Sequence, residues 1–277
     1  MKKNIIVKSF SVVLVALMLV ATLVGCGAKV EKAKYDLGIG LVMSADVESN
    51  TTTATVAAVA LDAEGKIALC RIDEIVVKAT VEGEDVKLAK SFKSNAELGN
   101  NADAKALEAT LVGKTATDVD VMEGAGAESL MEAVEAAIAS EHKVDFKASA
   151  EMTAGVAITA SADATDGVVT VSCDASAIVV DGGKVVSAVI DSIEGKLTVG
   201  TGFDGMASKL AQGDDYGMVK YADAISEWYT QAQRYANTAI GKTPTAVASL
   251  ETEGVAGCTI YVGGYKQTLV KAVEAAR

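Results

Sequence analysis

The chain has 277 residues, of which 50% are hydrophobic and 4% aromatic, so it is long enough to bury a sizeable core. Its 25 Lys and Arg residues stand against 37 Asp and Glu residues, a formal charge of -12, which repels phosphate backbones and makes nucleic acid an unexpected partner. One Pro and one His occur. This composition excludes a Pro-rich linker and a zinc site built on two imidazoles, and we expect no metal site, no catalytic residues and no enzyme activity.

The N-terminus reads as an export signal. Lys2, Lys3 and Lys8 precede an apolar run over residues 10–24, which ends in Leu-Val-Gly-Cys26 and resembles a bacterial lipobox. An ordinary secretory signal or a membrane-spanning helix is the alternative. We expect cleavage before Cys26 and a lipid, palmitate included, on its thiol.

This interpretation places the mature protein outside the cytoplasm, anchored to the cell membrane. Residues 1–25 form the lipoprotein signal peptide and residues 26–34 a tether. Removal of the signal takes away three lysines and no acid, so the mature charge is 22 minus 37, or -15.

Three cysteines remain, Cys70, Cys173 and Cys258, an odd number that cannot pair completely within the chain. Cys70 and Cys173 lie in strand-like segments, where a buried thiol acts as a small apolar residue. We favour buried thiols there, and a disulfide bridge is the alternative.

In chain order, we expect strands followed by helices in the first half, and again strands followed by helices in the second half. β-Branched runs bounded by Gly or Asp predict strands, whereas apolar residues at helical spacing predict helices, such as Leu130, Val134, Ala137 and Ile138. The predicted strands are 56–61, 66–77, 168–180 and 185–193, and the predicted helices are 130–138, 222–239 and 265–276. The fold class is therefore α+β with antiparallel strands followed by helices.

The two sets of elements share sequence motifs in the same order, which indicates a duplication. A Gly-Lys turn leads into Ile-Asp-x-Ile twice, at residues 62–75 and 181–193. Gly-Lys-Thr recurs at 113–115 and 241–243, and Ala-Val-Glu-Ala-Ala at 133–137 and 272–276. We predict two tandem domains, 35–141 and 150–277, joined by an accessible stretch at 141–149.

Four segments of the second half resemble FMN-binding-like lipoproteins of anaerobic Gram-positive bacteria. They are the stretch Gly213-Asp-Asp-Tyr216-Gly-Met218, Glu227-Trp228-Tyr229, Gly241-Lys242-Thr243, and Gly254-Val-Ala-Gly257-Cys258-Thr259. These proteins are similar to the FMN-binding domain of the sodium-pumping quinone reductase and of surface proteins in extracellular electron transfer. The resemblance implies two tandem FMN-binding-like copies, the first of them degenerate.

In that family a flavin transferase esterifies FMN to a threonine within a pattern close to D-x-x-S/T-G-A-T. Here Glu253 stands for the aspartate, Ala256 for the serine or threonine, Gly257 for the glycine, Cys258 for the alanine and Thr259 for the acceptor. Three of these five positions depart from the pattern. The resemblance implies covalent FMN on Thr259.

We expect Thr259 in the first turn of the C-terminal helix, exposed, with Gly257 in a turn and Cys258 beside it. Tyr216, Trp228, Tyr229 or Tyr261 would face the ring, and Lys242 or Lys266 would offset the charge. Alternatively, Thr259 is only a helix N-cap and Trp228 only core. In the first copy we align the acceptor position with Glu128, which has no hydroxyl.

Two other motifs are weaker. The glycines of Gly200-Thr-Gly-Phe-Asp-Gly205 fit a glycine-rich turn better than a dinucleotide site, because no parallel strand and crossover helix follow. Asp214, Asp215, Asp223 and Glu227 fit solvated turns better than a calcium site. The predicted function is electron carriage by FMN with an unidentified redox partner, and the alternative is a non-redox binding lipoprotein with a decayed flavin site.

Overall fold

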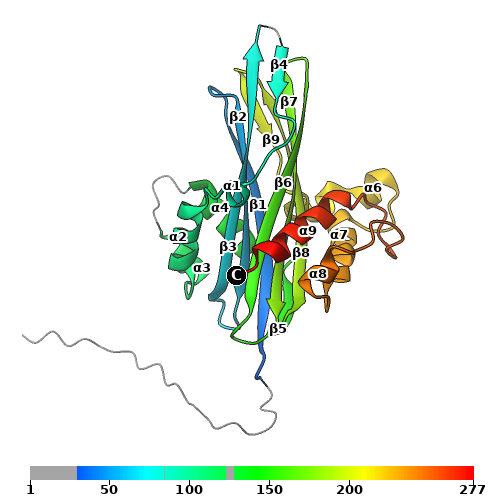
Figure 1. Cartoon of the computed structure of the whole chain (residues 1–277). Helices are drawn as coiled ribbons and strands as arrows, with labels where there is room; N and C mark the ends of the chain where they lie inside the picture. Colours follow the sequence, from blue (N-terminus) through cyan, green and yellow to red (C-terminus); the bar gives the residue numbers. More distant parts are fainter. Residues whose placement is uncertain (1–29, 84, 123–127) are drawn as a thin grey trace, which may run out of the picture. The chain divides into compact units, whose positions relative to one another are not determined.

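The structure is a computed structural model that describes residues 30–83, 85–122 and 128–277 (Figure 1). The predicted signal peptide and the lipid attachment at Cys26 lie outside the described residues, as does the segment 123–127. Within the described part of the chain, no helix is long and apolar enough to cross a membrane.

Each half of the chain contributes four strands and then helices. The first half comprises β1 (Ala33–Asp46), β2 (Thr51–Leu61), β3 (Ile67–Glu82), β4 (Asp85–Leu88), α1 (Asn95–Leu98), α2 (Ala102–Leu111), α3 (Ala116–Asp120) and α4 (Glu128–Ala139), followed by β5 (Val144–Ala148). The second comprises β6 (Thr153–Thr165), β7 (Val168–Asp181), β8 (Lys184–Thr198), β9 (Gly202–Gly205), α5 (Lys209–Gln212), η1 (Gly213–Tyr216), α6 (Met218–Ala222), α7 (Trp228–Ala236), η2 (Asn237–Ala239), α8 (Pro244–Val247) and α9 (Gly263–Ala275).

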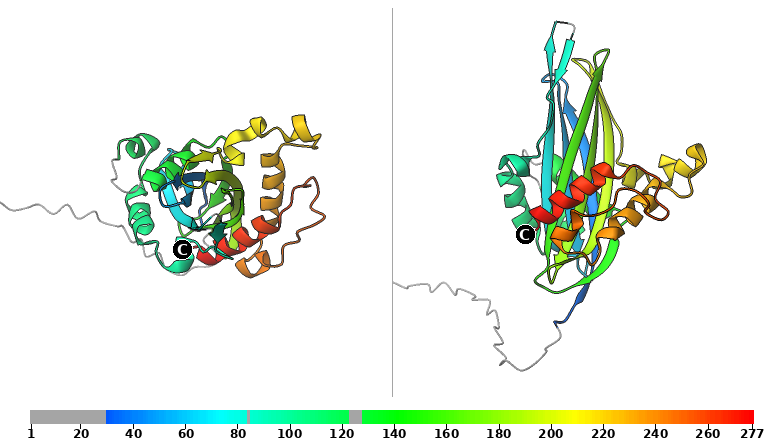
Figure 2. Two further views of the ribbon diagram at one scale, coloured as in Figure 1. Left: turned by 90° about the horizontal axis from the view of Figure 1, so that it is seen from above. Right: turned by 45° about the vertical axis from the view of Figure 1, so that its right-hand side comes forward.

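The strands form two antiparallel sheets, with orders β4-β3-β2-β1-β5 and β6-β7-β8-β9. This confirms the predicted α+β class with two antiparallel sheets, each followed by helices. The sheets face one another, with β1 beside β8 and β3 beside β6. The helices of the first half cover one outer face and those of the second half cover the opposite one (Figure 2).

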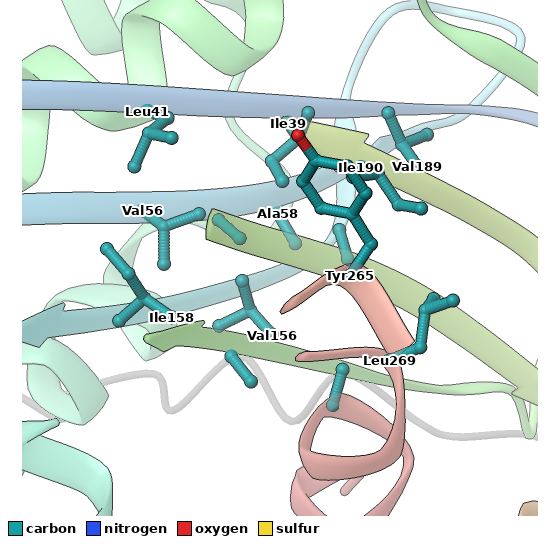
Figure 3. Close-up of a cluster of buried hydrophobic side chains, with 14 of the residues drawn as sticks. Ile39, Leu41, Val56, Ala58, Val156, Ile158, Val189, Ile190, Tyr265 and Leu269 are labelled. Atoms are coloured by element: carbon teal, nitrogen blue, oxygen red, sulfur yellow. The ribbon is translucent and has the colours of Figure 1, made fainter. Parts of the chain in front are cut away.

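Alternation along the strands explains these layers. In β1, Leu37, Ile39 and Leu41 are buried between the sheets, while the intervening Gly38 and Gly40 face α4. Figure 3 shows side chains of β1, β2, β6 and β8 in one buried cluster with residues of α9. Residues 32–277 therefore form one compact unit whose two halves share a core.

Tight turns join the strands where the sequence provides Gly or Asp. Gly182 and Gly183 both have positive φ (56° and 74°), as do Asp166 and Gly167 (50° and 77°), which matches the two-residue turns that suit twisted hairpins. The longer β2–β3 turn is held by Asp62, whose carboxylate accepts from the backbone N–H groups of Glu64 and Lys66.

The two halves make matching contacts, which is consistent with the predicted duplication. Asp73 accepts from the N–H of Ala96 at the start of α1, and Asp191 accepts from the N–H of Leu210 at the start of α5. The two Gly-Lys-Thr segments also match. In each, the Lys carbonyl accepts from the first residues of β3 or β8, and the Thr caps the next short helix. The acidic pair thus positions helix starts, as expected of a repeat rather than a catalytic dyad.

Glycines allow the last helix of each half to lie directly on its sheet. A Cβ at Gly38 would be 2.1 Å from the carbonyl oxygen of Ala137 in α4, and one at Gly155 would be 1.9 Å from that of Ala272 in α9. The sequence match had aligned Ala133 with Ala272. The structure aligns Ala137 with it, one helical turn later, and such a shift keeps the same helix face.

The predicted joint between the halves is mostly strand. Residues Val144–Ala148 form β5, which pairs with β1, so the expectation of few contacts at 141–149 is wrong. A second link is polar: Glu108 accepts from Arg277 (2.7 and 3.0 Å), while Arg71 donates to the carbonyl of Ala154 (3.2 Å). The division into FMN-binding-like copies 35–141 and 150–277 remains a prediction.

The largest differences from the predicted elements are β1 and β6, which open the two halves and were not predicted as strands. Both are rich in Ala and Gly, which are depleted in strands, and their small side chains make room for α4 and α9. The helix predicted over 222–239 begins only at Trp228, because Asp223 adopts φ 49° and interrupts it.

Candidate functional site

Thr259 lies in the loop that joins α8 to α9. It is exposed, and both its backbone N–H (2.7 Å) and its hydroxyl (3.0 Å) donate to Oε1 of Gln231. Gln231 is buried on α7, and its amide nitrogen donates to the carbonyl of Ser226. The threonine is therefore fixed to the body of the protein by one glutamine side chain.

The expected place of Thr259 in the first helical turn is wrong. Helix α9 begins at Gly263 with Val262 as its N-cap residue, so Thr259 lies four residues before the helix and does not cap it. The predicted turn at Gly257 is present, with φ 70°. Cys258 follows it, partly buried, and burial raises the pKa of its thiol.

The cation that contacts this loop is Arg234 of α7, which the sequence analysis did not select. Its guanidinium donates to the carbonyl of Gly257 (2.8 Å) and to the hydroxyl of Ser226 (3.1 Å). The expected Lys242 lies elsewhere, with its carbonyl bonded to Val185 at the start of β8. Arg234 therefore places a positive charge against the loop that carries Thr259.

An aromatic hollow of about 670 Å³ begins at the residue after Thr259. Its lining includes Ile260 together with Tyr216, Tyr221, Trp228, Tyr261 and Tyr265. Trp228 and Tyr265 are nearly buried (2% and 5% exposed) and meet edge to face, with ring centroids 5.9 Å apart, whereas Tyr261 is 87% exposed. The hollow therefore has a fixed aromatic wall and an open mouth. We call it the aromatic hollow below.

Lys209 and Asp174 bring opposite charges into the aromatic hollow. The Lys209 ammonium lies 5.2 Å from the ring centroid of Tyr216 and 5.6 Å from that of Trp228. Burial raises the pKa of Asp174, and a hydrogen bond from Ser192 and the charge of Lys209 oppose that shift. Among the described residues the two groups form no ion pair within 4.0 Å.

Helix α9 leaves room for Asp174. A Cβ at Gly264 would lie 2.0 Å from Oδ2 of Asp174, so the glycine at the start of the helix lets the carboxylate fit beneath it. One turn further along, the hydroxyls of Ser176 and Thr268 are 2.6 Å apart. The alternating polar residues of β7 thus lie under α9, a pattern in the sequence that could have indicated Asp174.

Of the predicted ring contacts, Tyr216 and Trp228 line the aromatic hollow and Tyr229 does not. The ring of Tyr229 stacks on His142 with centroids 4.3 Å apart, and its hydroxyl donates to Asp214 (3.1 Å). It borders a separate hollow of about 1100 Å³ that extends from α4 to α5 and η1. Tyr229 therefore belongs to a different surface from Thr259.

The other motifs have structural roles. Residues 200–205 turn from β8 into the antiparallel strand β9, so they do not form a dinucleotide-binding unit. Glu227 accepts from the N–H groups of Met218 and Val219 at the start of α6. Cys70 and Cys173 are free and fully buried, which agrees with the expectation of apolar thiols.

Glu128 does not occupy the place that the sequence analysis gave it. It is the first residue of α4 and so corresponds to Gly263, the first residue of α9, since Ala137 and Ala272 each follow nine positions later. The residues that correspond to the Thr259 loop fall within 123–127, outside the described residues.

Comparison of the chain with known protein families, with curated proteins and with solved structures gave no match.

Proposed function

We propose that this protein is a lipid-anchored, extracytoplasmic carrier of FMN, with the phosphate esterified to Thr259 and the ring in the aromatic hollow. The observation that carries the proposal is adjacency: an exposed hydroxyl lies one residue before an aromatic cavity. A volume of about 670 Å³ falls within the usual range of small-molecule sites.

The residues present fit the three parts of such a ligand. Thr259 offers a hydroxyl fixed by Gln231, and Arg234 of α7 places a guanidinium against the same loop for the phosphate. Trp228 and Tyr265 form a rigid aromatic wall against which a planar ring would lie. When bound, FMN would supply the capacity to accept and release electrons.

The chain itself would do three things. Gln231 would orient the acceptor threonine, Arg234 would offset anionic charge in a chain of formal charge -12, and the aromatic wall would exclude water from one side of the ring. The exposed Tyr221 and Tyr261 at the mouth leave one edge open, as exchange of electrons with a partner requires.

The test is co-expression of the mature protein with a flavin transferase, followed by intact mass and absorbance measurements. We expect the mass of one FMN less one water on the wild type, none on Thr259→Ala, and retained attachment on Thr259→Ser. Thr243→Ala, which removes a helix cap elsewhere, is the matched control and should be modified normally.

Equal modification of Thr259→Ala would reject this acceptor. A wild-type protein that gains no mass would favour the second candidate, a non-redox binding lipoprotein. That candidate rests on the departures from the flavinylation pattern at Glu253, Ala256 and Cys258.

A further inference from the structure

The two halves of the molecule use the same three positions differently. Asp73 and Asp191 match, so the residues that follow them, Glu74 and Ser192, also match. Their partners across the neighbouring strand match as well: Thr55 pairs with Glu74, and Asp174 pairs with Ser192.

The third position starts the first helix of each half. Asn95 and Lys209 each follow a serine that caps its helix, Ser94 in α1 and Ser208 in α5. The comparison is therefore between Thr55, Glu74 and Asn95 in the first half and Asp174, Ser192 and Lys209 in the second.

In the first half these three groups satisfy one another. The Thr55 hydroxyl donates to Glu74 (3.3 Å), and the Asn95 amide donates to the other oxygen of the same carboxylate (3.0 Å). Each oxygen of the carboxylate therefore has one protein donor. A closed set of this kind needs no ligand.

In the second half the equivalent set is closed only between Ser192 and Asp174, where the hydroxyl donates to the carboxylate. Asp174 and Lys209 both line the aromatic hollow and, among the described residues, do not touch one another as an ion pair. The ammonium is held over the rings of Tyr216 and Trp228 rather than at a carboxylate. A strong acceptor and a strong donor thus face one aromatic cavity, and a partly buried charge calls for a partner.

We propose that the aromatic hollow selects a planar ring with an imide edge, in which Asp174 accepts a hydrogen bond from the ring N–H and Lys209 donates to a neighbouring carbonyl. Such an edge presents a donor beside acceptors, which complements one carboxylate and one ammonium. The inference rests on the proposed function, since the flavin ring carries this edge, and it names the residues that read it.

The recognition would not depend on the phosphate or on Thr259. Riboflavin lacks the phosphate, and its 3-methyl derivative also lacks the imide N–H, so the two probes isolate the contact with Asp174. We expect riboflavin to bind the unmodified full-length mature protein with quenching of flavin fluorescence, and 3-methylriboflavin to bind about 10-fold or more weakly.

Variants of Asp174 and Lys209 test which residue discriminates riboflavin from 3-methylriboflavin. Asp174→Ala, which removes the acceptor, should weaken riboflavin about 10-fold and should no longer distinguish the two probes. Lys209→Met should weaken both probes alike. Glu194→Gln is the matched control: this carboxylate lines the same hollow but accepts from Ser172, so its loss should leave the discrimination unchanged.

Three results would overturn the inference: no riboflavin binding by the wild type, equal binding of both probes, or unchanged discrimination in Asp174→Ala. The two-probe comparison uses the wild type and therefore decides even if a variant fails to fold. If FMN is attached to Thr259 but the two probes bind equally, the proposed function is supported and this inference is rejected. If the probes are discriminated but no FMN is attached, this inference is supported and attachment at Thr259 is rejected.

Discussion

Replacing Gly155 by alanine tests whether close helix–sheet contact holds α9 in place. The new Cβ would lie 1.9 Å from the carbonyl oxygen of Ala272, whereas ordinary contact begins at 3.4 Å, so the helix must retreat by 3.4 minus 1.9, or 1.5 Å. Helix α9 buries Leu269 and Val273 against β6 and β7. A gap of about 0.5–1 Å removes a quarter to a half of the dispersion energy of an atom–atom contact. Overpacking alone lowers the stability by about 1–3 kcal/mol.

We therefore expect Gly155→Ala to lower the free energy of unfolding by about 2–4 kcal/mol in urea titrations at 25 °C. Gly202→Ala is the control, because a Cβ there meets nothing within 4 Å and its φ is ordinary for an L-residue. Tyr265 lies on the same helix, so riboflavin quenching should weaken in Gly155→Ala and not in the control. If the two variants differ in stability by less than about 0.5 kcal/mol, the close-contact argument is wrong.

Glu108→Ala should destabilise the protein by about 3–5 kcal/mol in the same titrations, because it leaves Arg71 without its buried counter-ion and the Ile72 N–H without an acceptor. Glu108→Gln can still accept from Ile72 and should destabilise the protein clearly less. Equal losses of stability in the two variants would contradict this account. Asp191 is buried, and burial raises its pKa to about 7, so the stability it contributes is present below its unfolded pKa of about 3.8 and is lost as the pH rises towards 7. In Asp191→Asn, the free energy of unfolding measured between pH 4 and 7 should lose this part of its pH dependence. An unaltered profile would show that Asp191 does not titrate in that range. Cys26→Ser should move the protein from the membrane fraction to the soluble fraction or leave an uncleaved precursor, and normal processing with unchanged fractionation would reject the lipobox.

The sequence alone determined the class of fold and indicated two similar halves. Local rules were enough for these features. Turn glycines such as Gly182 and Gly183 mark hairpins, β-branched runs mark β2, β3, β7 and β8, and helical spacing marks α4 and α9. The repeated Gly-Lys-Thr segments indicated two halves, and their matching hydrogen bonds agree. Apart from the repetition itself, each of these signals is contained within a few neighbouring residues.

Tertiary structure decided the strands that local propensity disfavours. Gly38 and Gly155 argue against β1 and β6 when read locally, and they are needed because a helix backbone passes directly over them. Residues 144–148 looked like a joint and became a strand because β1 had a free edge at that end. Neither helix approach nor edge pairing is encoded in the segment itself.

The candidate site was likewise only partly contained in the sequence. Thr259, Gly257 and Trp228 were identified from motifs, whereas Asp174 and Lys209 are 35 residues apart in the chain and come together only because β7, α5 and α9 meet around one cavity. The first half has the same topology and closes its equivalent polar groups on one another. Whether a polar residue is satisfied or left open to a ligand is fixed by its neighbours in space, and these are set by tertiary packing.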